Sequence, residues 1–202
     1  MPEPITTVGL EAIAAYLGKD AHASSNSTVE KGAHKISACS SLWTLDGAGM
    51  SSTHVSQHMN ALRESVYRAL LDPRAVAIWK VPAGMTCQVH AFDAREGGTF
   101  RISLTYDEPA GTGKTTAHTD TYHGRFASLV PNERVVEVDE FETENPALRA
   151  EMTITITLAD ADGGTDVLAV HEGLPPGVSS ADNETGWRMA LAKLAAFVEA
   201  GG

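Results

Sequence analysis

Residues 99–141 read TFRISLTYDEPAGTGKTTAHTDTYHGRFASLVPNERVVEVDEF, and this stretch decides the fold. Polar and apolar residues alternate, at least in part, over residues 99–107, 117–129 and 134–142. Alternation with a period of two indicates β-strands. The segments between them are rich in Pro, Gly and Asn, which favour turns. Because connections this short join antiparallel neighbours, we expect an antiparallel meander.

The same pattern continues on both sides of this stretch. Further strands are predicted over residues 85–94, 151–159 and 165–172, which makes six in succession. On the N-terminal side we predict a strand over 53–59, a helix over 62–71 and, after Asp72-Pro73, a second short helix over 75–79. On the C-terminal side, apolar residues at helical spacing predict an amphipathic helix over 182–199. We therefore predict an α+β fold, with a curved antiparallel sheet of about seven strands around the last helix.

The chain upstream of these elements has a different composition. Residues 21–52 are rich in Ser, Ala, Gly and Thr and show no stable period, as is typical of a linker. Residues 5–17 are weakly amphipathic and predict one short helix. We therefore divide the chain into an N-terminal extension, residues 1–49, which is flexible or weakly helical, and one folded domain, residues 50–202.

Composition narrows the classes of partner. Lys and Arg number 15 against 26 Asp and Glu, for a formal net charge of -11. A surface of this sign repels phosphate backbones and anionic headgroups, so neither nucleic acid nor a membrane surface is expected as a partner. Cys39 and Cys87 form no CxxC pair, which argues against a disulfide framework and a structural metal site. The N-terminus has no signal-like apolar run, so a cytoplasmic location is expected.

Several short motifs resemble those of one large superfamily. The match runs over about residues 50–198. Its motifs are Val66-Tyr67-Arg68-Ala69-Leu70, Asp72-Pro73, Trp79, Arg95-Glu96-Gly97-Gly98-Thr99-Phe100-Arg101, Tyr122-His123-Gly124-Arg125-Phe126, Glu133-Arg134-Val135-Val136, Met152-Thr153-Ile154-Thr155-Ile156-Thr157 and Gly186-Trp187. This set resembles the START-like superfamily, also called SRPBCC. The group to which it is most similar is that of the bacterial homologues of the activator of the heat shock protein 90 ATPase.

The resemblance implies a helix-grip fold, also known from the Bet v allergen. In this fold a cavity between sheet and C-terminal helix holds lipids, sterols, polyketides or aromatic molecules. The superfamily has no universal catalytic motif, so the resemblance implies no particular reaction and no cofactor.

Two motifs invite a more specific interpretation. Gly111-Thr112-Gly113-Lys114-Thr115 looks like the end of a phosphate-binding loop, but Glu108 stands where such a loop needs glycine, so an ordinary hairpin loop is favoured. The second motif is His118-Thr119-Asp120-Thr121-Tyr122-His123. On a strand, His118, Asp120 and Tyr122 share one face while His123 points to the other. The two histidines therefore do not converge on a metal, and the face that carries Tyr122 either lines a cavity or is solvated.

Large and polar residues at the ends of the predicted elements are the candidates for the cavity lining. Their simplest role is in the core or on the surface, and the functional alternative is that a subset contacts a ligand. The candidates are Trp79, Met85, His90, Phe100, Arg101, Tyr106, His118, Tyr122, His171 and Trp187.

Three functions remain open at this level. The first is binding of a small hydrophobic or aromatic molecule, in which a few of the polar candidates orient the ligand. The second is an enzyme, cyclase-like or hydrolase-like, in which His118 or Tyr122 acts as acid or base. The third is a cochaperone-like interaction protein that stimulates a chaperone ATPase. The first needs the fewest assumptions about particular residues. A homodimer is compatible with each of the three functions.

Overall fold

The computed structural model describes residues 52–107 and 113–202. The N-terminal extension predicted over residues 1–49 lies outside the described residues. The described strands are β1 (Thr53–Met59), β2 (Met85–Phe92), β3 (Thr99–Tyr106), β4 (Thr119–Val130), β5 (Arg134–Phe141), β6 (Met152–Ala161) and β7 (Gly164–Glu172). The helices are α2 (Arg63–Leu71), α3 (Pro73–Trp79) and α4 (Ser180–Glu199).

All seven strands belong to one antiparallel sheet. Its order is β1-β7-β6-β5-β4-β3-β2, so strands β2 to β7 form the predicted meander. The first strand pairs with the last, with Thr53 opposite His171. This pairing brings the start of the described domain next to the strand that leads into α4.

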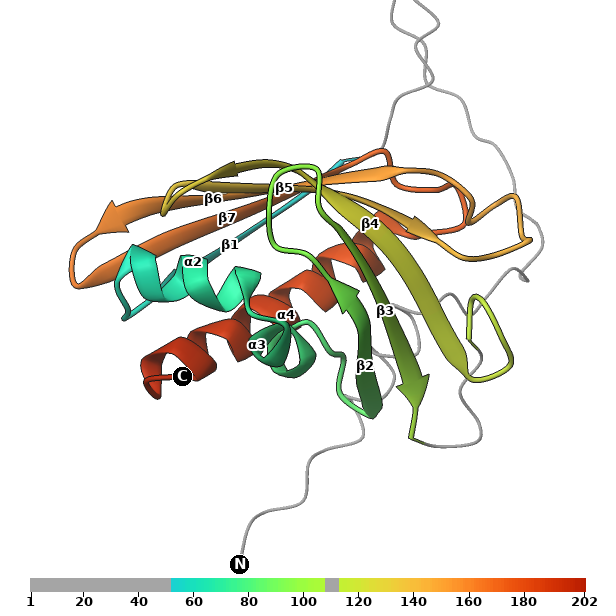
Figure 1. Ribbon diagram of the computed structural model, residues 1–202, viewed down its shortest axis with the longest axis horizontal. Coiled ribbons are helices and arrows are strands. Elements are labelled where there is room, and N and C mark those ends of the chain that lie inside the picture. The colour runs from blue at the N-terminus through green and yellow to red at the C-terminus, as the bar shows by residue number, and fades with distance from the viewer. Residues whose placement is uncertain (1–51, 108–112) are drawn as a thin grey trace, which may run out of the picture.

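The sheet curls around α4, and α2 and α3 lie on the same concave side (Figure 1). Register shifts in β2, between Val89 and Ala91, and between β4 and β5, at Phe126 and Ser128, mark irregular pairing of the kind that bends strands. One concave face therefore meets three helices. This is the helix-grip arrangement, and it confirms the predicted fold.

Local chemistry explains where two of the helices begin. Pro73 occupies the first turn of α3, and the Asp72 side chain accepts a hydrogen bond of 2.8 Å from the Arg74 backbone N–H. Ser179 caps α4 by accepting from the backbone N–H of Asp182. Because of this cap, α4 begins at Ser180, two residues before the predicted start.

The core lies between α4 and the concave face of the sheet. Trp187 on α4 packs edge-on against Trp79 of α3, with ring centroids 6.3 Å apart. The Trp79 indole N–H donates to the Ala69 carbonyl over 3.1 Å, which satisfies its buried polar atom. Within the described residues no helix is long and apolar enough to cross a membrane.

Candidate functional site

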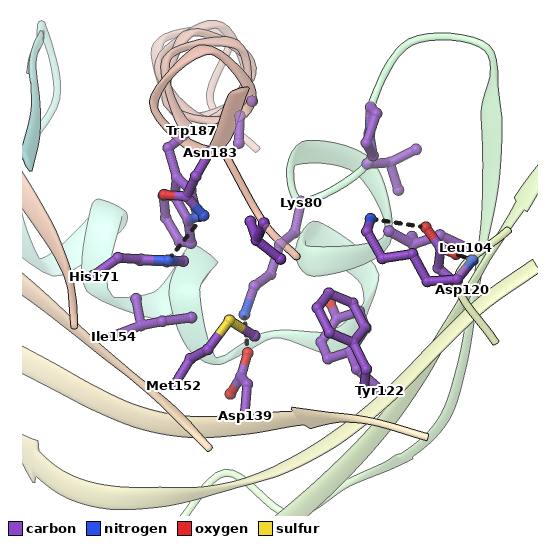
Figure 2. A pocket seen from close by; sticks show the side chains of 17 residues that line it. Lys80, Leu104, Asp120, Tyr122, Asp139, Met152, Ile154, His171, Asn183 and Trp187 are labelled. Atoms are coloured by element: carbon purple, nitrogen blue, oxygen red, sulfur yellow. Dashed lines mark hydrogen bonds and ion pairs between the residues drawn. The ribbon is translucent and has the colours of Figure 1, made fainter. Parts of the chain in front are cut away.

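A cavity of about 90 Å³ lies between the N-terminal half of α4, the concave face of the sheet and the loop after α3. Figure 2 shows the side chains that line it. Its walls are mostly apolar: Val81, Pro82, Leu104, Phe141, Met152, Ile154, Val178, Trp187 and Ala190. Its polar lining comprises Lys80, Lys114, Asp120, Tyr122, Asp139, His171 and Asn183. Apolar walls with a few convergent polar groups are characteristic of small-molecule sites.

Lys80 is the central cation of the site. It follows the last residue of α3, and its ammonium lies 2.5 Å from Oε2 of Glu137 and 3.9 Å from Oδ2 of Asp139. Both carboxylates belong to β5, where residues two apart face the same side of the sheet. Figure 2 shows Lys80 and Asp139 pointing toward one another, with His171 and Tyr122 on opposite sides of them.

Burial and charge shift the pKa values of Lys80, Asp139 and Tyr122. Burial alone would lower the pKa of Lys80, but Glu137 and Asp139 outweigh it and raise that pKa above its ordinary value. Burial raises the pKa of Asp139 from 3.8 to about 7, because the opposing effect of Lys80 is smaller and Glu137 adds repulsion. Burial likewise raises the pKa of the Tyr122 hydroxyl. Lys80 is therefore held as a cation, and burial favours the protonated form of Asp139.

A glycine makes room for the Asp139 carboxyl group. Gly124 on β4 is paired with Asp139, and a Cβ at Gly124 would lie 2.7 Å from Oδ1 of Asp139 and 2.5 Å from Cζ of Phe100. No larger side chain fits there unless one of these groups moves. Among the described residues, this Oδ1 atom is buried and has no hydrogen-bond partner.

A chain of hydrogen bonds orients His171 at the other side of the cavity. The Thr53 hydroxyl donates to Oδ1 of Asn183 over 2.6 Å, and the Asn183 amide nitrogen lies 3.1 Å from Nδ1 of His171. Because the amide donates, Nδ1 accepts and the ring proton resides on Nε2. Burial, together with the charge of Lys80, lowers the pKa of His171 to about 3, so the ring is neutral. The Nε2 atom has no partner within the part of the chain described.

A second ion pair closes the far end of the cavity. Lys114 and Asp120 are both buried, with Nζ of Lys114 at 3.2 Å from Oδ2 of Asp120. The Lys114 backbone N–H also donates to the same carboxylate. The Lys114 side chain is therefore not held out toward a phosphate group. It turns back into the domain, where its ammonium lies 5.1 Å from the centre of the Phe141 ring.

The structure brings three of the ten sequence candidates into the cavity lining: Tyr122, His171 and Trp187. Trp79, Met85 and Phe100 are buried in the core, and Tyr106 is half-buried against it. Tyr122 also contacts Phe100, with ring centroids 6.5 Å apart, so this part of the core supports the cavity wall.

The other three candidates lie on the surface. Arg101 points away from Phe100, as alternation requires, and forms two bonds of 2.8 and 2.9 Å to the Glu142 carboxylate. His90 is exposed and contacts the Ser103 hydroxyl, while His118 is exposed just before β4 begins. His118 therefore does not share the buried face of Asp120 and Tyr122. A direct ligand-binding role stays a prediction for every candidate.

Sequence reasoning missed most of the charged lining. Lys80, Asp139 and Lys114 carry charges, and charged residues are on the surface by default. Asp120 was expected on the face of Tyr122 but was not among the ten candidates. One signal was available: Glu137 and Asp139 alternate with Val136 and Val138, so one of the two sets had to face the helices. Within the described residues, no group of three or more His, Cys, Asp or Glu side chains is placed to hold a metal ion.

Comparisons with known proteins agree on the family. A family model described as activator of Hsp90 ATPase homolog 1-like protein matches residues 60–199. No curated protein matches the chain. The crystal structure of a Chromobacterium violaceum protein is 34% identical, with a TM-score of 0.66, and the match covers 73% of this chain and 96% of that one.

More distant solved structures share the fold. A Rhodobacter sphaeroides protein is 20% identical with a TM-score of 0.63, over 78% of this chain and 97% of its own. The solution structure of an AHSA1-like protein from Aeromonas hydrophila is 18% identical with a TM-score of 0.58, over 75% and 94% of the two chains.

Proposed function

The chain belongs to the family of activator of Hsp90 ATPase homolog 1-like proteins, and within that family we propose that it binds a small, mostly apolar molecule carrying a carbonyl or hydroxyl oxygen. The observation that carries the proposal is that two residues of the apolar cavity's lining, His171 and Asp139, each have a buried polar atom without a partner among the described residues, Nε2 and Oδ1. An unpaired buried polar atom costs about 1 to 3 kcal/mol. A ligand oxygen that accepts from His171 recovers part of that cost.

The polarity of the site favours this ligand over an anion or a cation. Lys80 is already paired with Glu137, and Asp139 adds a second carboxyl group, so an incoming carboxylate meets repulsion. A cationic ligand meets the Lys80 ammonium and the His171 N–H instead. A neutral oxygen avoids both penalties, and a hydroxyl can in addition donate to Asp139.

The size of the cavity limits the ligand. A volume of about 90 Å³ is below the roughly 300–1,000 Å³ of sites for drug-sized molecules, and below the roughly 150 Å³ of an engineered cavity that accepts benzene. One ring therefore fits only if a wall adjusts, for which the unbranched side chain of Met152 is suited. We propose a ligand of about one ring with a single oxygen substituent.

Thermal-shift measurements with phenol, cyclohexanone and toluene test the proposal. Phenol and cyclohexanone should raise the Tm in proportion to RT ln(1 + [L]/Kd), and toluene should raise it less because it leaves His171 unpaired. Ala190 lines the cavity, so Ala190→Phe should fill it and abolish the shift. Ala192 is exposed on the same helix, and Ala192→Phe is the matched control that should keep the shift.

The proposal fails if none of the three compounds shifts the Tm of the wild type, or if Ala190→Phe responds as the wild type does. The first outcome would favour the alternative of an interaction protein whose cavity binds no ligand.

A further inference from the structure

We propose that the same cavity catalyses proton transfer at carbon: Asp139 removes a proton from the carbon next to a ketone carbonyl, while His171 donates a hydrogen bond to the carbonyl oxygen. The inference rests on the proposed function, because the ketone must first bind in the cavity. It goes beyond binding by assigning a reaction class, keto–enol tautomerisation, and a role to each of the two residues.

Asp139 is placed as a base because it is not held in a close ion pair. Glu137 is the nearer partner of the Lys80 ammonium, at 2.5 Å, which leaves Asp139 at 3.9 Å. The charged and titratable groups around it are Lys80 from the loop after α3, Glu137 on its own strand, Tyr122 on β4 and His171 on β7. A carboxyl group whose pKa is about 7 has the proton affinity that suits a general base near neutral pH.

His171 is placed as the electrophilic partner. The Thr53–Asn183–His171 chain fixes the ring as the Nε2–H tautomer, and that nitrogen has no other partner within the described residues. A fixed N–H donor stabilises the negative charge that develops on an enolate oxygen. The Lys80 ammonium, which remains protonated, adds positive charge near the same centre.

The step balances without a further reactant. The C–H bond next to the carbonyl breaks and its proton bonds to an Asp139 oxygen. The electron pair of that bond forms the C=C bond of the enolate, and the C=O π pair moves to the oxygen, which His171 hydrogen-bonds. Return of a proton from Asp139 to carbon regenerates the ketone. In D2O, exchange of the Asp139 proton with solvent turns each cycle into deuterium incorporation.

The experiment measures deuterium incorporation into cyclohexanone and cyclopentanone in D2O by NMR, with saturation-transfer NMR in the same samples to detect binding. The wild type should accelerate exchange about 10²-fold or more over buffer, and Asp139→Asn should lose about 10²-fold while it still binds the probe. Glu140→Gln is the matched control, because Glu140 is the next residue on β5, on the opposite face to Asp139. Its exchange rate should equal that of the wild type.

The pH profile gives a readout that a purely structural role would not produce. The exchange rate in the wild type should rise with pH as Asp139 ionises and level off above about 7. The inference is overturned if a ketone binds but exchanges no faster than in buffer alone, or if the exchange rate with Asp139→Asn equals that of the wild type. Either result leaves the proposed function standing. Absence of binding by both ketones overturns the inference, and it overturns the proposed function as well where phenol also fails to bind.

Discussion

At the scale of single residues, the domain places ionisable groups where burial determines their charge. Asp139 and His171 lie on the same concave face of the sheet, and burial moves their pKa values in opposite directions, to about 7 and to about 3. Both groups therefore tend toward their neutral forms, as the cost of burying charge requires. Lys80 remains charged because two carboxyl groups surround it.

Asp139→Asn should change how stability depends on pH. Above about pH 4 the unfolded carboxyl group ionises while the folded one keeps its proton up to about pH 7, so Asp139 lowers the free energy of unfolding as pH rises through that window. The slope is at most about 1.4 kcal/mol per pH unit. Urea denaturation at several pH values should therefore show the variant gaining about 2 to 4 kcal/mol over the wild type between pH 4 and pH 8.

The opposite slope contributed by His171 is present in both proteins and cancels in this difference. A difference between variant and wild type that does not change with pH would show that Asp139 ionises as an ordinary surface carboxyl group does.

The residue scale is also where the sequence was least informative. Tyr122, His171 and Trp187 were among the candidates because aromatic residues and histidines on predicted strands and helices are common in cavity linings. Asp139 was missed because strand 134–142 offers two alternating sets, and an apolar set such as Val136 and Val138 is the usual choice for the buried face. Lys80, which comes from another part of the chain, pairs with Glu137, and burial favours the neutral form of Asp139, so this set can lie inside.

At the scale of elements, prediction and structure agree closely. Each predicted strand overlaps an observed one, and their ends differ by at most two residues, because period-two alternation and turn residues are local signals. The pairing of β1 with β7 joins segments more than a hundred residues apart and has no local signal. His118 shows the consequence of a shifted strand end: β4 begins at Thr119, so the alternation no longer applies to this residue.

Helix α4 is the element whose packing matters most for the cavity. Trp187 is 5% exposed and contacts Trp79 and His171, with ring centroids 6.3 and 4.7 Å away. Trp187→Ala should therefore lower the free energy of unfolding by about 3 to 5 kcal/mol, as measured by chemical denaturation. Arg188→Ala changes the exposed neighbour and should stay within about 0.5 kcal/mol of the wild type. A loss below about 1 kcal/mol for Trp187→Ala would mean that α4 is not anchored through this residue.

At the scale of the whole molecule, one sheet and one long helix account for the fold. Every helix and strand described lies between Thr53 and Glu199, and the family match spans residues 60–199. The architecture was predictable because a run of six short strands followed by an amphipathic helix has few compact solutions. The family does not fix the ligand, which depends on side chains inside the cavity.

The division of the chain at residue 50 can be tested directly. A chain of residues 50–202 should fold alone and unfold cooperatively, with a Tm within a few degrees of the full chain, because it contains every described element. Circular dichroism during heating provides the measurement. A non-cooperative transition or a large drop in Tm would show that residues 1–49 contribute to the folded domain.

The most direct test of the cavity as a ligand site is the side-chain ¹H–¹⁵N correlation spectrum of His171, recorded with and without cyclohexanone. The hydrogen-bond chain from Thr53 through Asn183 predicts the neutral Nε2–H tautomer in the free protein. The ketone should shift the Nε2–H resonance as that N–H acquires a partner, and Ala190→Phe should prevent the shift. An Nδ1–H tautomer, or a His171 spectrum unchanged by saturating cyclohexanone, would contradict the proposed site.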